Sequence, residues 1–365
     1  MASEVFWADM RTKKRKNLVN KVAGLWRKAG FKRAIADQDL VAVKIHFGEK
    51  GNLAYINPVF ARQIVELVKA SKGMPFLTDS NTLYVGSRSN AVEHLQTAIE
   101  NGFAYAVVGA PVIIADGLKG KDYYEVPIEG KHFRQVKISS AIYHADSMVV
   151  MSHFKGHELT AFGGTIKNLG MGCGSPGGKQ MMHSDVLPEV QEEKCVGCGL
   201  CRRWCPAEAI TVNEKASIDA GLCIGCGECT VTCPERAIKA SFKSDPVVLQ
   251  EKIVEFALGA VKDKKDKCVY FNFLTHVAPE CDCNSWNDAA IIPDVGILAS
   301  WDPVALDQAS LDLANAQPAL PGTRLDGRGN VKDKFQAISG YDGTHLLRYA
   351  EEVGLGTREY KLIKI

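Results

Sequence analysis

The stretch LVAVKIHFG (Leu40–Gly48) is an apolar run of β-forming residues that ends near His46. It is followed by PVFARQIVELVKAS (Pro58–Ser71), in which apolar residues recur with a helical period after a proline suited to a first turn. MPFLTDSN (Met74–Asn81) is a second apolar run. Alternation of strand and helix predicts an α/β fold built on a mostly parallel sheet.

The same alternation extends toward both ends of the chain. NAVEHLQTAIENGF is typical of a helix that stops at Gly102, and a helix over 302–314 has Asp302 as its expected N-cap. The remaining expected elements are strands in PVIIADG, SMVVMSHF (Ser147–Phe154), CVYFNFLT (Cys268–Thr275) and DVGILAS (Asp294–Ser300), and a helix over Pro246–Val261.

Composition and charge exclude several classes of protein. The 365 residues are 46% hydrophobic and 24% charged, with a formal net charge of +2, so no global field favours nucleic acid or an anionic membrane. The basic run RTKKRK (Arg11–Lys16) is interpreted as the solvated start of a helix that continues through Leu18, Val22 and Leu25. No secretory signal is visible and no run approaches about 20 apolar residues, so we expect a cytoplasmic protein.

Eight of the twelve cysteines lie in a duplicated run. CVGCGLCRRWCPAEAI (Cys195–Ile210) and CIGCGECTVTCPERAI (Cys223–Ile238) each contain C-x2-C-x2-C-x3-C-P. Clustered cysteines inside a cell indicate metal binding rather than disulfides. This pattern binds [4Fe–4S] cubanes and resembles the bacterial-type two-cluster ferredoxins, which implies transfer of low-potential electrons in an anaerobic setting.

The fourth cysteine of each run begins a Pro-started segment and, in this pattern, ligates the other cluster. We therefore predict two [4Fe–4S] clusters with crossed ligation. Two zinc sites are the alternative, but they would leave four cysteines of the repeat unexplained. The predicted ligands are Cys195, Cys198, Cys201 and Cys233 for cluster 1, and Cys223, Cys226, Cys229 and Cys205 for cluster 2.

The position of the repeat predicts the domain organisation. Patterns of α/β type lie on both sides of it, so we expect an α+β ferredoxin module at residues 192–241, inserted into an α/β domain formed by residues 1–191 and 242–365. Four cysteines lie outside the repeat. They are Cys173, Cys268, Cys281 and Cys283. We interpret them as buried or free thiols. The alternative is a further metal site formed by Cys281-Asp-Cys283 with His276.

Polar residues follow the predicted strands where each one ends. His46, Asp79 and His153 all occupy such positions. In open α/β sheets, ligands bind beyond the carboxyl ends of the strands, so these three side chains are candidates for one shared crevice.

The segment HELTAFGGTIKNLGMGCGSPGGKQMMH (His157–His183) frames Lys167 with glycines and two histidines. The glycines, Gly163 and Gly164 among them, permit close approach of backbone to a ligand, and the nitrogen side chains suit an anionic group or proton transfer. The alternative is an ordered loop that shields a cluster from water.

Four segments together resemble the domain-of-unknown-function 362 family, over nearly the whole chain. They are VAVKIHFGEKGN, TDSNTLYVGSR, SHFKGHELTAFGGTIKNLGMG and ILASWDPVALD. That family is often found with a ferredoxin module, and the resemblance implies an iron–sulfur electron carrier or redox partner.

The spacing H-x9-K-x15-H is also similar to that of the nickel-pincer lactate racemase family. By that resemblance Lys167 would anchor the cofactor after Gly163–Gly164, His183 would ligate nickel, and His157 would be an acid/base. Asn168-Leu169-Gly170 only partly matches the family's motif after the lysine.

Three functions therefore stand as hypotheses. The first is an electron-transfer protein whose clusters relay electrons between a donor and a partner redox enzyme. The second is an oxidoreductase that reduces a small anionic substrate through His153, His157, Lys167 and His183. The third is a nickel-dependent racemase-like isomerase. Neither nucleic acid nor a membrane is expected as a partner.

Overall fold

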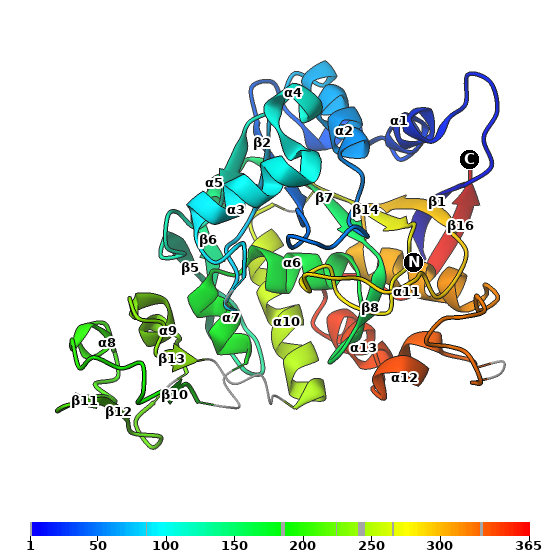
Figure 1. Cartoon of the computed structure of the whole chain (residues 1–365). Coiled ribbons are helices and arrows are strands. Elements are labelled where there is room, and N and C mark those ends of the chain that lie inside the picture. The colour runs from blue at the N-terminus through cyan, green and yellow to red at the C-terminus, as the bar shows by residue number, and fades with distance from the viewer. Residues whose placement is uncertain are drawn as a thin grey trace.

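A computed structural model describes residues 2–84, 86–183, 187–223, 225–239, 245–264, 266–328 and 331–365. Its centre is an eight-stranded sheet in the order β16-β1-β15-β14-β7-β2-β3-β4. Strands β14, β7, β2, β3 and β4 pair in parallel, and β15 pairs antiparallel with both β14 and β1. The predicted α/β fold with a mostly parallel sheet is confirmed (Figure 1).

The strands of this sheet occupy the predicted runs and add two strands from the chain ends. β1 and β16 pair in parallel with each other, so the two ends of the chain share one edge of the sheet. The bounds are β1 (Ser3–Asp9), β2 (Leu40–Ile45), β3 (Met74–Asp79), β4 (Val112–Ile114), β7 (Ser147–His153), β14 (Cys268–Leu274), β15 (Gly296–Ser300) and β16 (Tyr360–Lys364).

Apolar side chains cover both faces of the sheet. In β7, Met148 and Val150 join one core while Val149 and Met151 join the other, as the two-residue period of a strand requires. Strands buried on both faces explain why their sequences are continuously apolar rather than alternating. Helices α6 (Thr165–Cys173), α10 (Pro246–Val261), α11 (Pro303–Asn315) and α13 (Thr344–Glu352) cover one face, and α1 (Leu18–Lys28) and α2 (Pro58–Ala70) cover the other.

Capping residues set the ends of the helices. Asp302 caps α11 as predicted, since its carboxylate accepts from the backbone N–H of Val304 at 2.8 Å and of Ala305 at 3.0 Å. The prediction for the basic run was wrong: α1 begins at Leu18, because the Asn17 side chain caps it, and residues 11–16 precede the helix. Among the described residues, no helix is long and apolar enough to cross a membrane.

The shorter elements complete the large domain. Gly102, with φ of 91°, lies in the π turn that ends the helix predicted at this point. These elements are 3-10 helix η1 (Phe31–Ala34), π turn η2 (Ile99–Phe103), helices α3 (Ala91–Ala98), α4 (Tyr105–Val108), α5 (Ser140–His144), α7 (Pro176–Met182) and α12 (Lys334–Ser339), and strands β5 (Tyr123–Pro127), β6 (Gln135–Ser139), β8 (Lys155–His157) and β9 (Ala161–Gly163).

The duplicated cysteine run has a small core of its own. Its buried side chains include Ile210, Ala216, Ala237 and Ile238, together with several of the cysteines. Figure 1 shows this part at the lower left, with α9 next to α7. The boundary predicted at residue 241 lies outside the described residues. Its elements are β10 (Glu189–Val190), α8 (Leu200–Arg203), β11 (Ile210–Val212), β12 (Ala216–Ile218), α9 (Glu228–Thr232) and β13 (Ile238–Lys239), with β10 pairing β13 and β11 pairing β12.

Two glycines, Gly164 just before α6 and Gly170 within it, lie so close to neighbouring helices that a side chain would not fit. A Cβ atom on Gly170 would overlap the carbonyl oxygen of Ile253 in α10, and one on Gly164 would overlap the carboxylate of Asp307 in α11. The Asp307 carboxylate accepts from the first backbone N–H groups of α6, at 2.8 Å from Thr165 and 2.9 Å from Ile166. These two glycines therefore serve helix packing.

Replacement of Gly170 by alanine should destabilise the protein by about 1–3 kcal/mol, because the new methyl group meets a backbone carbonyl that no rotamer change can move. Thermal unfolding measures this. Gly24→Ala in α1 is the matched control, since its Cβ would meet only the terminal methyl of Ile365 at 3.2 Å. An equal or higher melting temperature for Gly170→Ala than for Gly24→Ala would contradict the packing argument.

Candidate functional site

A pocket of about 500 Å³ lies at the carboxyl ends of the parallel strands. His46 follows β2, Asp79 ends β3 and His153 ends β7, and all three line this pocket. The sequence-based expectation that they share one crevice is thus met by the geometry. The large domain positions them because parallel strands present their ends at one edge of the sheet.

The glycine-rich segment forms a second wall of the same pocket. His157 comes from β8, Lys167 from α6, and His183 directly follows α7; all three line the pocket, as does Gly164. Gly163 lies in β9, with the side chains of Lys167 and Lys155 beside it. The residues proposed from sequence therefore lie around one pocket. Gly164 is a glycine because a side chain there would overlap the Asp307 carboxylate.

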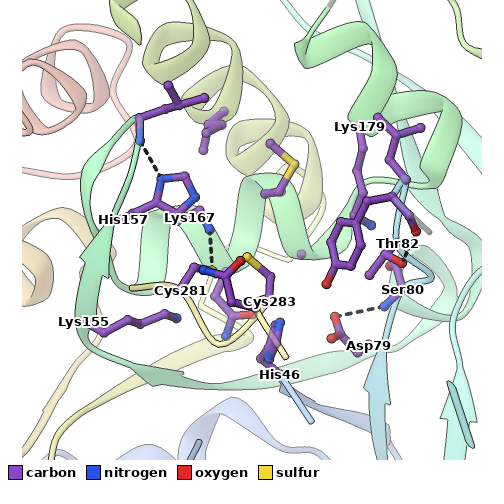
Figure 2. A pocket seen from close by; sticks show the side chains of 18 of the residues that line it. His46, Asp79, Ser80, Thr82, Lys155, His157, Lys167, Lys179, Cys281 and Cys283 are labelled. Carbon is purple, nitrogen blue, oxygen red and sulfur yellow. Dashed lines mark hydrogen bonds between the residues drawn. The ribbon is translucent and has the colours of Figure 1, made fainter. Parts of the chain in front are cut away.

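Several lining residues were not predicted as site residues. Cys281 and Cys283 enter from the loop after β14, and Figure 2 shows Lys167 pointing toward Cys281. Their C-x-C spacing was the one available signal. The other unpredicted lining residues are charged and scattered through the chain, so no sequence pattern marks them. They are Arg88, Lys155, Glu158 and Lys179.

Positive charge prevails in the pocket. Four cationic side chains line it against two carboxylates, Asp79 and Glu158. Burial lowers the pKa of Lys179 to about 8, in opposition to the nearby Asp116 carboxylate. An anion would relieve the cost of burying these cations, so the pocket favours a negatively charged ligand.

Buried ion pairs neutralise part of this charge, with partners both on the pocket wall and behind it. Lys44 lies 2.9 Å from Asp79, and Arg88 lies 3.2 Å from Glu49 and 3.5 Å from Asp79. Burial raises the pKa of Asp79, but Lys44 and its other cationic neighbours outweigh that effect and hold the pKa well below its usual range. Asp79 therefore stays a carboxylate and holds the Lys44 and Arg88 side chains in place.

His157 is arranged as a hydrogen-bond donor. Its Nδ1 atom accepts from the backbone N–H groups of Leu159 and Thr160, each at 3.2 Å. Burial lowers the pKa of His157 well below its usual value, and Lys167 and Lys155 add to this effect. The ring is therefore neutral with its proton on Nε2, which can donate to a bound anion.

His153 is held differently, although it too was proposed as catalytic. Its Nδ1 lies 2.8 Å from an Asp282 oxygen, and its Nε2 lies 2.9 Å from the carbonyl oxygen of Thr275. These two contacts hold the ring of His153 between the Asp282 carboxylate and the backbone after β14. His153 thus anchors the loop that carries Cys281 and Cys283, through the residue between them.

The two cysteines of that loop have opposite protonation tendencies. A hydrogen bond from the Cys283 thiol lowers the pKa of Cys281 to about 5 against the effect of burial, and Lys167 and Lys155 lower it further. Lys167 Nζ lies 3.3 Å from Cys281 Sγ. Cys281 is therefore a thiolate at neutral pH, while the pKa of Cys283 is well above its usual value because it donates to Cys281.

The predicted cluster ligands gather in two groups. Cys195, Cys198, Cys201 and Cys233 line one small cavity of the cysteine module. Burial raises the pKa of the Cys229 thiol to about 12, and nearby Cys226, Cys223 and Cys205 of the second predicted set raise it further, as does Cys201 of the first set.

Backbone N–H groups point at cysteine sulfurs in both copies of the run. Ala209 N donates to Cys205 Sγ and Ala237 N to Cys233 Sγ, each at 3.3 Å, and the two bonds are related by the repeat. Such bonds favour thiolates. In the described part of the chain, no three His, Cys, Asp or Glu side chains converge tightly enough for a single ion. A cubane instead distributes four thiolates over four irons.

The module docks on α7 through its second cysteine loop. A Cβ on Gly177 would lie 3.2 Å from the carbonyl oxygen of Cys226, and one on Gly227 would overlap Gln180. Glu228 accepts from Lys137 at 2.7 Å and from Tyr123 at 3.0 Å, which ties α9 to β5 and β6. The same helix α7 contributes Lys179 to the pocket.

Comparison with known proteins defines the family. The family model described as domain of unknown function (DUF362) matches residues 41–312, about three quarters of the chain. The chain belongs to the DUF362 family. This confirms the resemblance drawn from its sequence motifs, and no curated protein matches the chain.

Two solved structures are similar to this DUF362 protein. Lactate racemase apoprotein from Thermoanaerobacterium thermosaccharolyticum has 11% identity and a TM-score of 0.39, over 74% of this chain and 50% of that one. A Thermotoga maritima protein has 9% identity and a TM-score of 0.35, over 72% and 52%. The chain thus spans about half the length of each.

Replacement of Lys167 by methionine should raise the pKa of the Cys281 thiol by about 1–3 pH units, because an opposite charge in contact with the sulfur is lost. The pH dependence of Cys281 alkylation by iodoacetamide, followed by peptide mass spectrometry, measures this. Lys361→Met, at an exposed position on β16, is the control. An unchanged titration in Lys167→Met would show that this ion pair does not stabilise the thiolate.

Proposed function

We propose that this DUF362 protein is an iron–sulfur oxidoreductase, which holds two [4Fe–4S] clusters and delivers electrons to a small anionic substrate in the basic pocket. The observation that carries this proposal is the double contact of α7. One side of this helix packs against the Cys226–Gly227 loop, and Lys179 from the same helix lines the pocket. Electron carrier and substrate chamber thus share one structural element.

The chemistry of the cysteine module suits the two clusters. The ligand sets remain those of the sequence prediction, three cysteines from one run and the fourth from the other, and the grouping of Cys195, Cys198, Cys201 and Cys233 around one cavity supports them. Gln180 offers a further fit: its side-chain amide is buried next to Gly227 and has no hydrogen-bond partner in the described structure. When bound, such clusters supply single electrons at low potential.

The pocket residues have separate tasks in this proposal. Lys179 attracts and neutralises the anion, and its buried setting strengthens that attraction relative to water. Arg88, whose charge Glu49 and Asp79 already balance, can still donate hydrogen bonds to the anion. His157 donates from Nε2 to an oxygen of the substrate. β8 and the 281–284 loop line one side of the pocket and shield that side of the substrate from water.

The other two hypotheses differ from this one in testable ways. A pure electron carrier would have no use for a buried cationic pocket of this size, and a partner protein remains a proposal as donor of the electrons. The nickel-dependent isomerase stays a prediction that depends on Lys167 and His183, which line the pocket together. Metal analysis distinguishes iron alone from iron with stoichiometric nickel.

Protein prepared without oxygen should contain about eight irons and eight acid-labile sulfides per chain. Cys205→Ala should lose the signal of the cluster held mainly by the second run and retain about four irons. Cys173→Ala, a buried thiol outside the repeat, is the control and should keep all eight. Iron and sulfide assays with EPR of the dithionite-reduced protein measure this, and a colourless zinc protein would refute the proposal.

Reduced protein should be reoxidised by particular small anions from a panel of carboxylates, sulfur oxyanions and anionic disulfides, and not by their neutral analogues. Anaerobic loss of the reduced EPR signal measures this. Arg88→Met and Lys179→Met should each slow reoxidation by tenfold or more, on the order of one lost charge contact, whereas the exposed-site variant Lys32→Met should not. If no anion accelerates reoxidation, the protein is a carrier only.

A further inference from the structure

Cys281 and Cys283 form a feature that the proposed function does not use. Both line the basic pocket, and Cys281 is 2% exposed. One residue separates the two cysteines in the same loop, and Lys167 Nζ lies 3.3 Å from Cys281 Sγ. A thiolate paired with a neighbouring thiol is the arrangement required for thiol–disulfide exchange.

The surroundings of the pair support a redox role. Asp282, between the two cysteines, turns away from the pocket and binds His153 and Lys155, so the loop presents both sulfurs on its other side. His276, the possible third metal ligand considered from sequence, instead accepts from Asn287 at 3.3 Å. The described residues near the pair therefore offer no third ligand for a metal ion.

We propose that Cys281 and Cys283 are a redox-active dithiol–disulfide couple, and that its substrate is a small anionic disulfide bound in the basic pocket. The inference rests on the proposed function for its supply of electrons, but its first step does not need them. The pocket size suits a small molecule, and the lysine and arginine side chains that line it, although partly balanced by neighbouring anionic groups, suit a negatively charged one.

The couple reduces the substrate disulfide in two steps, and a separate reduction restores the cysteine pair. The Cys281 thiolate attacks one sulfur of the substrate disulfide, which breaks the S–S bond and releases one substrate thiolate. Cys283 then attacks Cys281 in the mixed disulfide, and the Cys283 proton leaves with the second substrate sulfur, which is released as a thiol. Restoration of the pair takes two electrons and one proton, which break the Cys281–Cys283 bond to give one thiolate and one thiol. Two one-electron iron–sulfur centres, held by the cysteine module as proposed above, would supply these electrons.

The test uses anaerobic holoprotein and dithiodiglycolate, a small dianionic disulfide, with bis(2-hydroxyethyl) disulfide as its neutral counterpart. Wild-type protein should release two thioglycolates and form the Cys281–Cys283 disulfide, seen by non-reducing peptide mass spectrometry. Cys283→Ser should release one and keep a thioglycolate adduct on Cys281. Cys281→Ser should do neither, and Cys268→Ser should match the wild type, because burial raises the pKa of Cys268 to about 12.

The charge of the pocket gives a second readout. Dithiodiglycolate should react about tenfold or more faster than the neutral disulfide, and Lys167→Met should reduce that preference. A wild-type protein that forms no Cys281–Cys283 bond would overturn the proposal, as would a Cys281→Ser variant that reacts like the wild type. The retained adduct in Cys283→Ser is a positive result that misfolding cannot produce at one residue.

A final experiment distinguishes failure of this inference from failure of the proposed function. The oxidised pair is treated with a photoreduced flavin that reduces iron–sulfur clusters, in wild type and in Cys205→Ala. Recovery of both thiols in the wild type but not in the variant supports both proposals. If the disulfide forms but is not reduced in either protein, electron delivery fails, while the exchange chemistry of Cys281 and Cys283 stands.

Discussion

Close backbone contact at glycine is the constraint on which the arrangement of this molecule depends. Within 14 residues, glycines bring α6 against the Asp307 carboxylate, then against the Ile253 carbonyl, and bring α7 against the Cys226 carbonyl. A side chain at Gly164 or Gly170 would overlap its neighbour, and one at Gly177 would lie only 3.2 Å from the Cys226 carbonyl oxygen. Because α6 and α7 also carry Lys167 and Lys179, the same contacts fix the pocket and its distance from the cysteine module.

Much of the architecture could be predicted from sequence because its signals are local. The apolar runs at β2, β3, β7 and β14 are long and unbroken, so strand positions were correct, and strand ends then placed His46, Asp79 and His153 at one edge. The antiparallel placement of β15 and the pairing of β1 with β16 depend on contacts between distant parts of the chain. No short sequence pattern predicts these strand pairings.

The glycine-rich segment shows where a correct observation led to an incomplete interpretation. Its glycines were read as a surface for a ligand or as a shield for a cluster. The structure divides them: Gly164 and Gly170 pack against helices, while Gly177 meets the cysteine module. Sequence could not separate these uses, since glycine is favoured wherever backbone must approach closely, whatever lies opposite.

The distribution of protons explains how one small pocket can hold so many ionisable groups. Asp79 stays ionised to balance Lys44 and Arg88 behind the wall, and His157 stays neutral because Lys167 and Lys155 lie beside it. The Cys281 thiolate is then the negative group in contact with Lys167. A bound anion would compete with that thiolate for the lysine, and loss of its partner would make the sulfur more basic and more nucleophilic. In the proposed reaction, binding and activation of the thiolate would thus be coupled through the Lys167 ammonium group.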